Sequence, residues 1–290
     1  MQKYIALLKI LETGSFTRAA EVLGYTQPSL SQMISTLEKE LSVQLIHRSR
    51  YGVHPTPEGE RLLPFIESAV SQYETMQQAV DEMAGLKTGE VRIGTFSSVS
   101  CHWLPPVIER YWSEFPNIQI HLLQGDYTSI AEWVRLGIVD FGFVNPDAIQ
   151  GMRTTTLLMD DFCAVLPMNH PLSGCEAISL KMLEHEPFLL LEEGRYSEPL
   201  EAFRAEGVEP NIRLRGHDDY SILSMVERGL GVSILAELVL KKTAYQIVSR
   251  PLDPPVIRKI GIVMKEAGTL PKASKEFIKY LREVIDTRQK

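Results

Sequence analysis

The chain has 290 residues and the composition of an ordinary globular protein, and its length suits two or three domains. Its formal net charge of −7 argues against nucleic-acid binding over the whole surface, although residues 1–56 carry six basic and four acidic side chains, a net of +2, which leaves −9 for the remainder. Three cysteines without paired spacing exclude a disulfide framework and a zinc site, and no uninterrupted apolar run reaches the ~18–20 residues of a membrane helix.

Residues 2–13 are expected to form the first helix. Its stretch YIALLKIL is interrupted by Lys9, so it does not read as the apolar segment of a signal peptide. The side chains that we expect to face a small helical core are Tyr4, Ile5, Leu8 and Leu11. We therefore expect a cytoplasmic protein with no membrane partner.

A short helix, a tight turn and a longer helix are predicted next. Ser15 and Thr26 are suitable N-caps, and Gly24 suits the left-handed residue that ends the short helix. In the longer helix, residues 27–40, the apolar positions that form a buried stripe are Leu30, Ile34, Leu37 and Leu41. Its opposite face carries short, uncharged polar side chains, namely Gln27, Ser29, Ser31, Gln32 and Ser35. Such a face can contact base edges in a major groove, so residues 16–35 predict a helix-turn-helix, although a plain two-helix corner has the same outline.

Two short extended stretches follow, at residues 45–48 and 53–55, and they flank a basic tip. This pattern predicts a hairpin, or wing, beside the helix-turn-helix. Arg48 and Arg50 lie on or next to its tip, where they are suited to contact backbone phosphate or the minor groove.

The run SFTRAAEVLGYTQPSLSQMISTLEKELSVQLIHR, followed by TPEGERLL, is similar to the DNA-binding end of LysR-type transcriptional regulators. The resemblance implies a multidomain α and α/β chain: a winged helix-turn-helix at 1–57, a linker helix and hinge at 58–88, and a two-lobed, periplasmic-binding-protein-like (type 2) effector domain at 89–290. The family often has arginine where this chain has Gln32, so other arginines are expected to make more of the phosphate contacts. The candidate DNA-binding residues are Arg18, Gln27, Pro28, Ser29, Ser31, Gln32, Ser35, Arg48 and Arg50.

A long helix is expected to begin at Pro57, with Thr56 as its cap and a kink at Pro64. The apolar positions that recur along it at steps of four and three are Leu62, Ile66, Ala69, Tyr73, Met76, Val80 and Met83. This narrow heptad seam favours pairing with a second copy over packing within one domain. We expect a homodimer or homotetramer, with a hinge at 85–89.

Strand and helix patterns alternate from Glu90 onward, which predicts parallel sheets in two α/β lobes. A single helix is expected at about 100–115. We assign lobe I to 89–161 plus 266–290 and lobe II to 162–265, with crossings near 160–163 and 264–268.

Ligands of open α/β sheets collect at the carboxyl ends of the strands. The polar residues that we expect to meet an effector there are Thr95, Ser97, Ser98, Tyr127, Thr128, Asn145, Glu193 and Ser197. Ser97 serves equally well as a helix cap, the family resemblance implies effector contact at about Ser98, and Asp218 and Asp219 read better as caps. A helix start at 97–98 favours an anion and Glu193 favours a cation, so a zwitterionic effector satisfies both.

These patterns predict a sequence-specific, effector-responsive transcriptional regulator that needs no cofactor or metal. Its partners are double-stranded promoter or operator DNA, a small-molecule effector, a second copy and, further, RNA polymerase. Enzyme motifs such as the P-loop, GxSxG and HExxH are absent from the sequence, and the winged helix argues against a transport receptor. Cys101, near an expected helix start, leaves redox sensing as a lesser alternative, because the thiols lie far apart in the sequence.

Overall fold

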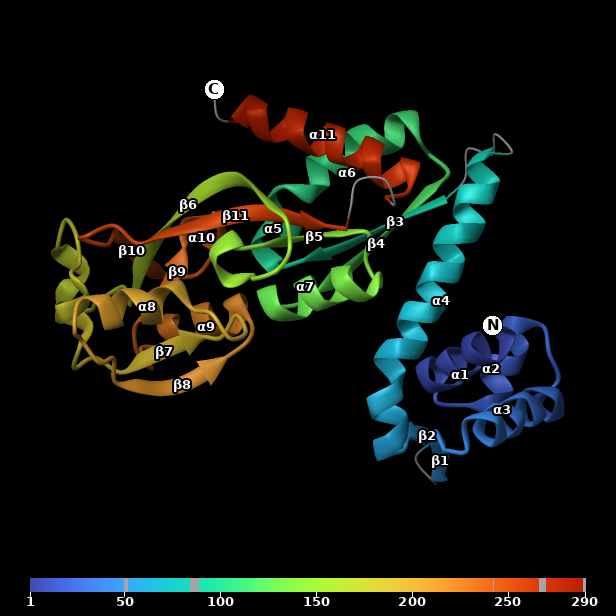
Figure 1. The fold of residues 1–290 in the computed structure, drawn as a ribbon. Helices are drawn as coiled ribbons and strands as arrows, with labels where there is room; N and C mark the ends of the chain where they lie inside the picture. The colour runs from blue at the N-terminus through green and yellow to red at the C-terminus, as the bar shows by residue number, and fades with distance from the viewer. Residues whose placement is uncertain (50–51, 84–88, 242, 266–269, 289–290) are drawn as a thin grey trace. The chain divides into compact units, whose positions relative to one another are not determined.

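The structure is a computed structural model that describes residues 1–49, 52–83, 89–241, 243–265 and 270–288 (Figure 1). The chain divides into two compact units. The first contains residues 1–86 with 136–138, and the second contains residues 87–135 with 139–290. Among the described residues, none of the helices combines the length and the apolar character needed to cross a bilayer.

The N-terminal unit contains four helices and a two-stranded antiparallel hairpin. Its elements are α1 (Gln2–Thr13), α2 (Phe16–Leu23), α3 (Gln27–Leu41), β1 (Ile46–Ser49), β2 (Gly52–Pro55) and α4 (Pro57–Met83). The predicted caps are confirmed. Ser15 Oγ accepts from the Arg18 N–H, Thr26 Oγ1 accepts from the Ser29 N–H, and Gly24 has a φ of 70°. Local cap chemistry therefore sets the boundaries of this helix-turn-helix.

The core of this unit differs from the expected one at two places. In α1 the fully buried side chains are Ala6, Leu7 and Ile10, while Tyr4, Leu8 and Leu11 pack only at its edge and Ile5 is half-buried. The buried face of α1 is thus rotated from the predicted one. In α3 the stripe is buried at Leu30, Ile34 and Leu37, but Leu41 is 37% exposed because the helix ends there, at the left-handed residue Ser42.

Three elements meet at the backbone of Leu45. Glu38 Oε1 in α3 accepts from the Leu45 N–H at 2.8 Å, and the Thr56 N–H donates to the Leu45 carbonyl at 2.9 Å. Thr56 Oγ1 also accepts from the Gly59 N–H at 2.9 Å, as predicted for the cap of α4. Gly59 lies so close to Leu45 that any side chain at position 59 would collide with the Leu45 carbonyl.

The predicted seam of α4 divides along its length. Ile66 is buried in the core of the N-terminal unit, and Leu62 packs against the same core, so we assign these two side chains to that core rather than to a partner. Ala69, Met76 and Val80 are exposed and Tyr73 is half-buried, whereas the Met83 side chain lies outside the described residues.

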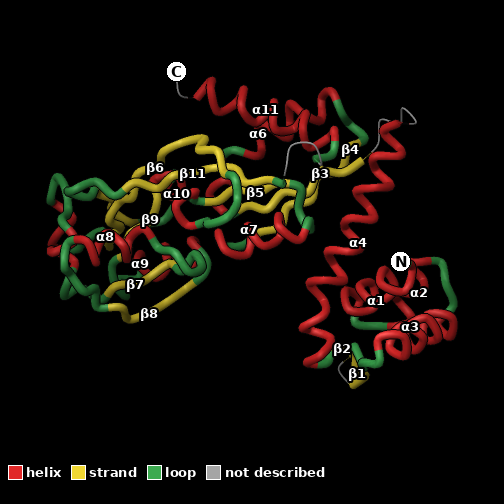
Figure 2. Tube along the Cα trace, viewed as in Figure 1, coloured by secondary structure: helices red, strands yellow, loops and turns green. Residues whose placement is uncertain are grey.

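The second unit is built on a seven-stranded mixed sheet with the order β10-β6-β11-β5-β3-β4, in which β9 also pairs with β6. The elements of lobe I are β3 (Gly89–Thr95), α5 (Ser97–His102), α6 (Leu104–Glu114), β4 (Ile118–Gln124), α7 (Tyr127–Leu136), β5 (Phe141–Val144), β11 (Ile257–Met264) and α11 (Lys272–Arg288). The predicted parallel pairing is confirmed, since β3 runs parallel to both β4 and β5. Figure 2 shows α6 and α11 on one face of this part of the sheet and α7 on the other.

Lobe II is built around a parallel pair of strands, β7 and β8. The elements of lobe II are β7 (Phe188–Leu191), α8 (Glu198–Ala205), β8 (Ile212–Gly216), α9 (Asp219–Glu227), β9 (Ser233–Ala236), α10 (Glu237–Leu240) and β10 (Ile247–Pro251). The sequence did not predict α10 or β10.

The single helix expected at 100–115, in lobe I, is also wrong. It is broken at Trp103 into α5 and α6, because Pro105 and Pro106 have no N–H to continue the helical hydrogen bonds.

One long strand, β6 (Thr154–Pro167), carries the chain from lobe I to lobe II. It pairs with β11 through Asp161 and with β9 from Phe162 onward, so the first crossing lies within the expected 160–163. The return lies between Leu252, in the core of lobe II, and Ile260, in the core of lobe I. The expected return at 264–268, and with it the lobe boundary at 265, is therefore placed too late, because β11 begins at Ile257 and belongs to lobe I throughout.

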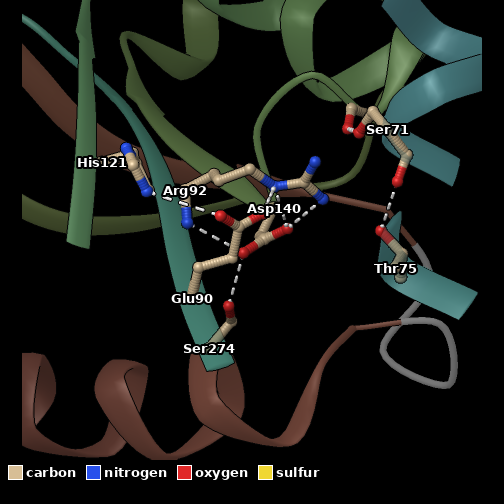
Figure 3. A network of polar contacts seen from close by, with 8 residues as sticks. Ser71, Thr75, Glu90, Arg92, His121, Asp140 and Ser274 are labelled. Carbon is tan, nitrogen blue, oxygen red and sulfur yellow. Dashed lines mark hydrogen bonds and ion pairs between the residues drawn. The ribbon is translucent and has the colours of Figure 1, made fainter. Parts of the chain in front are cut away.

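A buried ionic network joins β3, the loop residue Asp140 before β5, and α11 in lobe I (Figure 3). Arg92 Nη2 on β3 donates to Asp140 Oδ1 at 2.9 Å, and Asp140 Oδ2 accepts from the Arg92 N–H at 2.9 Å and from Ser274 Oγ on α11 at 2.7 Å. Both carboxylate oxygens of Asp140 thus accept hydrogen bonds from within the protein. We therefore assign this network a role in stabilising the fold.

Gly59→Ala is expected to weaken the N-terminal unit, because the added Cβ would lie 2.1 Å from the Leu45 carbonyl oxygen. We expect the free energy of opening of α1 and α3 to fall by about 1–3 kcal/mol, measured by hydrogen exchange of peptides from residues 1–60 in the full chain. Gly174→Ala is the control, since a Cβ there meets nothing within 4 Å. Unchanged exchange in Gly59→Ala would contradict the close approach of α4 to Leu45.

Candidate functional site

The N-terminal unit presents the predicted polar face of α3. Pro28, Gln32 and Ser35 are exposed, and Gln27, Ser29 and Ser31 are half-buried. Arg18 on α2 is exposed as well. With Leu30, Ile34 and Leu37 buried, α3 is held to the core by one face, and its neutral donors and acceptors lie on the opposite face.

Arg48 on the wing contacts this face directly. Its guanidinium carbon lies 3.9 Å from the centre of the Phe16 ring, and its Nη2 donates to Ser31 Oγ at 3.0 Å. Because the Ser31 hydroxyl accepts from Arg48, its own O–H remains available to donate to a further acceptor. Arg50, the other predicted wing contact, lies outside the described residues.

A cavity of about 400 Å³ lies between the two lobes of the second unit. Lobe I and lobe II both contribute residues, and the lining side chains and glycine are Phe96, Ser97, Gln124, Gly125, Asp126, Tyr127, Ser129, Trp133, Leu191, Glu192, Glu193, His217, Asp218 and Asp219. Three predicted effector residues, Ser97, Tyr127 and Glu193, are therefore in its wall.

A buried arginine lies behind this wall, at the crossing strands. Arg258 on β11 is 1% exposed, and its Nη2 donates to Asp160 Oδ2 on β6 at 2.5 Å and to Ser98 Oγ at 3.2 Å. Its Nη1 lies 3.8 Å from Glu193 Oε1. Burial alone would lower the pKa of Arg258, but the neighbouring Tyr127, Glu193 and Asp160 raise it, so this guanidinium stays charged.

Glu198 at the start of α8 joins the lobes at a second point. Its Oε1 accepts from Asn145 Nδ2 at 2.6 Å and from Tyr127 Oη at 3.3 Å, while within the described chain its Oε2 has no hydrogen-bond partner. Burial raises the pKa of Glu198, against the hydrogen bond from Asn145, which lowers it. Tyr127 and Asn145, both predicted to touch an effector, thus link lobe I to lobe II.

Other predicted effector residues use their hydroxyls within the protein. Thr95 Oγ1 donates to the Phe96 carbonyl, Ser197 Oγ accepts from the Leu200 N–H as the cap of α8, and Thr128 Oγ1 accepts from the Arg195 N–H at 3.5 Å. Ser98 is held by Arg258. These four residues bond within the protein and are not among those that line the cavity.

Asp218 and Asp219 were both expected to cap a helix, and only Asp218 does so. Asp218 Oδ2 accepts from the Ser221 N–H at 2.7 Å and caps α9. Asp219 is only 6% exposed and faces the cavity, where burial raises its pKa to about 6; Arg258 opposes this shift and Asp218 adds to it. Burial also raises the pKa of Glu193 to about 8, against Arg258 and with help from Glu198 and Asp219.

Arg258 and Asp160 were missed by the sequence analysis. On β11, Arg258 is buried and Lys259 is only half-buried, an alternation that the sequence analysis did not use. The structure also bears on the alternative of redox sensing by cysteine. Cys101 lies in the last turn of α5 rather than at its start, and burial raises the pKa of Cys163 to about 11, which keeps that thiol protonated.

Comparison with known proteins identifies both units. A family model described as a bacterial regulatory helix-turn-helix protein, lysR family, matches residues 1–60, and the LysR substrate binding domain matches residues 84–286. An uncharacterised HTH-type transcriptional regulator of Bacillus subtilis (strain 168), YvbU, is 32% identical over 281 residues, 96% of each chain.

Two solved structures share the fold. An OxyR C206 mutant of Corynebacterium glutamicum has a TM-score of 0.61 at 25% identity, over 99% of this chain and 91% of that one. Full-length CbnR, crystallised with its target DNA, has a TM-score of 0.71 at 19% identity, over 98% of this chain and 99% of that one.

Arg258→Met is expected to destabilise the second unit by about 3–5 kcal/mol, because it leaves the buried Asp160 carboxylate without its cation. The matched control is Lys259→Met, whose pair with Asp147 is 40% exposed on the lysine side and is worth at most about 1 kcal/mol. Urea unfolding followed by fluorescence of Trp103, Trp112 and Trp133 measures both. Equal losses would show that Arg258 is not the central cation of this site.

Proposed function

The chain belongs to the LysR family of bacterial transcriptional regulators, and on this premise we propose that α3 reads an operator while the cavity between the lobes holds the controlling effector. The family consists of DNA-binding regulators, not enzymes. The observation that carries the DNA-reading assignment is the neutral polar face of α3, with the wing arginine Arg48 bonded to Ser31.

The candidate DNA-binding residues of the N-terminal unit fall into an uncharged group and a basic group. Gln32 and Ser35 are exposed, uncharged and suited to base edges, whereas Arg18 and Arg48 carry the charge that phosphates attract. Arg48 is fixed against Phe16, so it is pre-positioned rather than ordered on binding. CbnR, which shares this fold, was crystallised in complex with its target DNA, and this supports DNA binding by a chain of this fold.

A second copy is proposed to pair along the exposed part of α4. Met76 is 51% exposed and Val80 is 53% exposed, and they continue the apolar repeat beyond the residues buried in the N-terminal core. Pairing there as a dimer, or as a dimer of dimers, would place two α3 helices on two half-sites. Since its promoter DNA lies in the cytoplasm, we place the protein there.

The effector is proposed to act by changing the relation of the two lobes. The cavity wall comes from both lobes, and Tyr127 and Asn145 of lobe I already bond to Glu198 of lobe II. A ligand that contacts both walls favours whichever lobe arrangement it fits best, and this shifts the population of states that bind the operator.

Gln32→Ala is expected to lower affinity for the operator roughly ten-fold while leaving affinity for random DNA nearly unchanged, because a base contact contributes only at the specific site. The operator is first mapped by footprinting the DNA upstream of the chain's own gene, and fluorescence anisotropy then compares the two DNAs over a range of salt. Gln119→Ala, an exposed glutamine on β4, is the control. A loss of equal size on both DNAs would mean that Gln32 contacts backbone only.

Met76→Glu is expected to raise the dissociation constant of the dimer roughly ten-fold or more, since it introduces a charge into an apolar seam. Sedimentation velocity at several protein concentrations measures the shift. Gln77→Glu adds the same charge one position away, where the side chain is polar and exposed, and is expected to leave assembly unchanged. Identical behaviour of the two variants would remove the α4 seam from the interface.

A further inference from the structure

The cavity between the lobes has an unusual charge balance. Five carboxylates are in its wall, and its lining contains no lysine or arginine. The carboxylates are those of Asp126, Glu192, Glu193, Asp218 and Asp219. Acidic side chains alone do not make a ligand site, and carboxylates that are already bonded within the protein do not need a ligand.

Three of the five are committed within the protein. Asp126 Oδ1 accepts from the Ser129 N–H at 2.8 Å and caps α7, and Asp218 caps α9 in the same way. Glu192 Oε1 accepts from Arg215 Nη1 at 2.8 Å. These three carboxylates are therefore already hydrogen-bonded within the protein.

Asp219 has no such partner. It is 94% buried, it faces the cavity, and within the described part of the chain no hydrogen bond or ion pair reaches its carboxylate. A buried carboxylate without a partner is costly unless it is protonated or meets a cation. The open side of Asp219 is the cavity itself.

Glu193 is in nearly the same position. Its nearest cation, Arg258 Nη1, lies 3.8 Å away, and that guanidinium makes its short ion pair with Asp160 at 2.5 Å instead. Asp160, Glu193, Glu198 and Asp219 therefore share a single buried arginine. Among the described residues this cluster has more carboxylates than cations, and two of them, Glu193 and Asp219, line the cavity.

The uncharged part of the wall suits an organic cation. Phe96, Tyr127 and Trp133 all line the cavity, and the rings of Phe96 and Tyr127 pack edge to face with centroids 5.5 Å apart. Aromatic faces attract ammonium and guanidinium groups, while a bare metal ion prefers oxygen ligands throughout its shell. An anion would instead meet Asp219 and Glu193 at close range, and α5, with six residues, is too short to offset them.

We propose that the effector carries an ammonium or guanidinium group that binds between Asp219 and Glu193 against these aromatic rings. This assignment rests on the proposed role of the cavity as the effector site and names the chemical class of its ligand. The sequence left open whether the effector is anionic, cationic or zwitterionic. We now favour a cationic group, because Ser98, the expected contact for an anion, already accepts a hydrogen bond from Arg258.

The proposal has a defined pH dependence. The groups that face Glu193 are Arg258, Glu198, Asp219 and Asp160, and those that face Asp219 are Arg258 and Asp218. Because burial raises the pKa of Glu193 to about 8 and that of Asp219 to about 6, both must lose protons to receive a cation. Affinity for an amine should therefore rise with pH and level off above about 8, by up to about ten-fold per pH unit where one of these groups is protonated.

The test is isothermal titration of the full chain with 1,4-diaminobutane, 4-aminobutylguanidine and succinate. We expect saturable binding of at least one of the two cations and none of succinate. Asp219→Asn should weaken cation binding ten-fold or more without loss of folding, because it removes an unpaired buried charge. Glu201→Gln, which removes a carboxylate that is paired with Arg204 on the surface of α8, should bind as the original chain does.

Three results would overturn the proposal: binding of succinate in place of the cations, equal cation affinity in Asp219→Asn and the original chain, or no saturable binding of either cation. The same preparations are footprinted on the operator. Absence of a footprint with cation binding intact would refute the regulatory role and leave the ligand class standing. A footprint that no cation alters, despite binding, would refute effector control alone.

Discussion

The buried pair of Arg258 and Asp160 is the interaction on which the second unit depends. It joins β11 to β6 at the place where β6 passes from lobe I to lobe II, and it also holds Ser98. An arginine that is almost fully buried must keep its charge, so the surrounding carboxylates are arranged around a fixed cation. The cluster contains more carboxylates than this one guanidinium can neutralise, and two of them, Glu193 and Asp219, line the cavity.

This imbalance connects stability with regulation. Carboxylates whose pKa is raised by burial oppose folding once the pH exceeds their unfolded values, and a cation in the cavity removes that opposition. The free energy so gained is available only in an arrangement of the lobes that brings both walls to the ligand. A ligand of opposite charge gains nothing there, so the same residues that bind the effector also select its class.

Features that depend on neighbouring residues were predictable from the sequence, and contacts between residues far apart in the sequence were not. Ser15, Thr26 and Gly24 act within one helical turn, and each was found where the pattern placed it. Ser98 depends on Arg258, 160 positions away, and Tyr127 and Asn145 depend on Glu198 in the other lobe. Polar residues at the ends of strands did point to the cavity, since Ser97, Tyr127 and Glu193 line it. Which hydroxyl or carboxylate remains free there follows from packing that no local spacing reveals.

The most direct test of this account is an NMR titration of side-chain carboxyl carbons in the full chain labelled at aspartate and glutamate, with Glu193→Gln and Asp219→Asn to assign the two signals. The account predicts midpoints near 8 for Glu193 and near 6 for Asp219 in the free protein, and a fall in both when an organic cation is added. Midpoints of about 4 for both, the range of ordinary exposed carboxyls, would contradict the claim that this cavity lacks a positive charge.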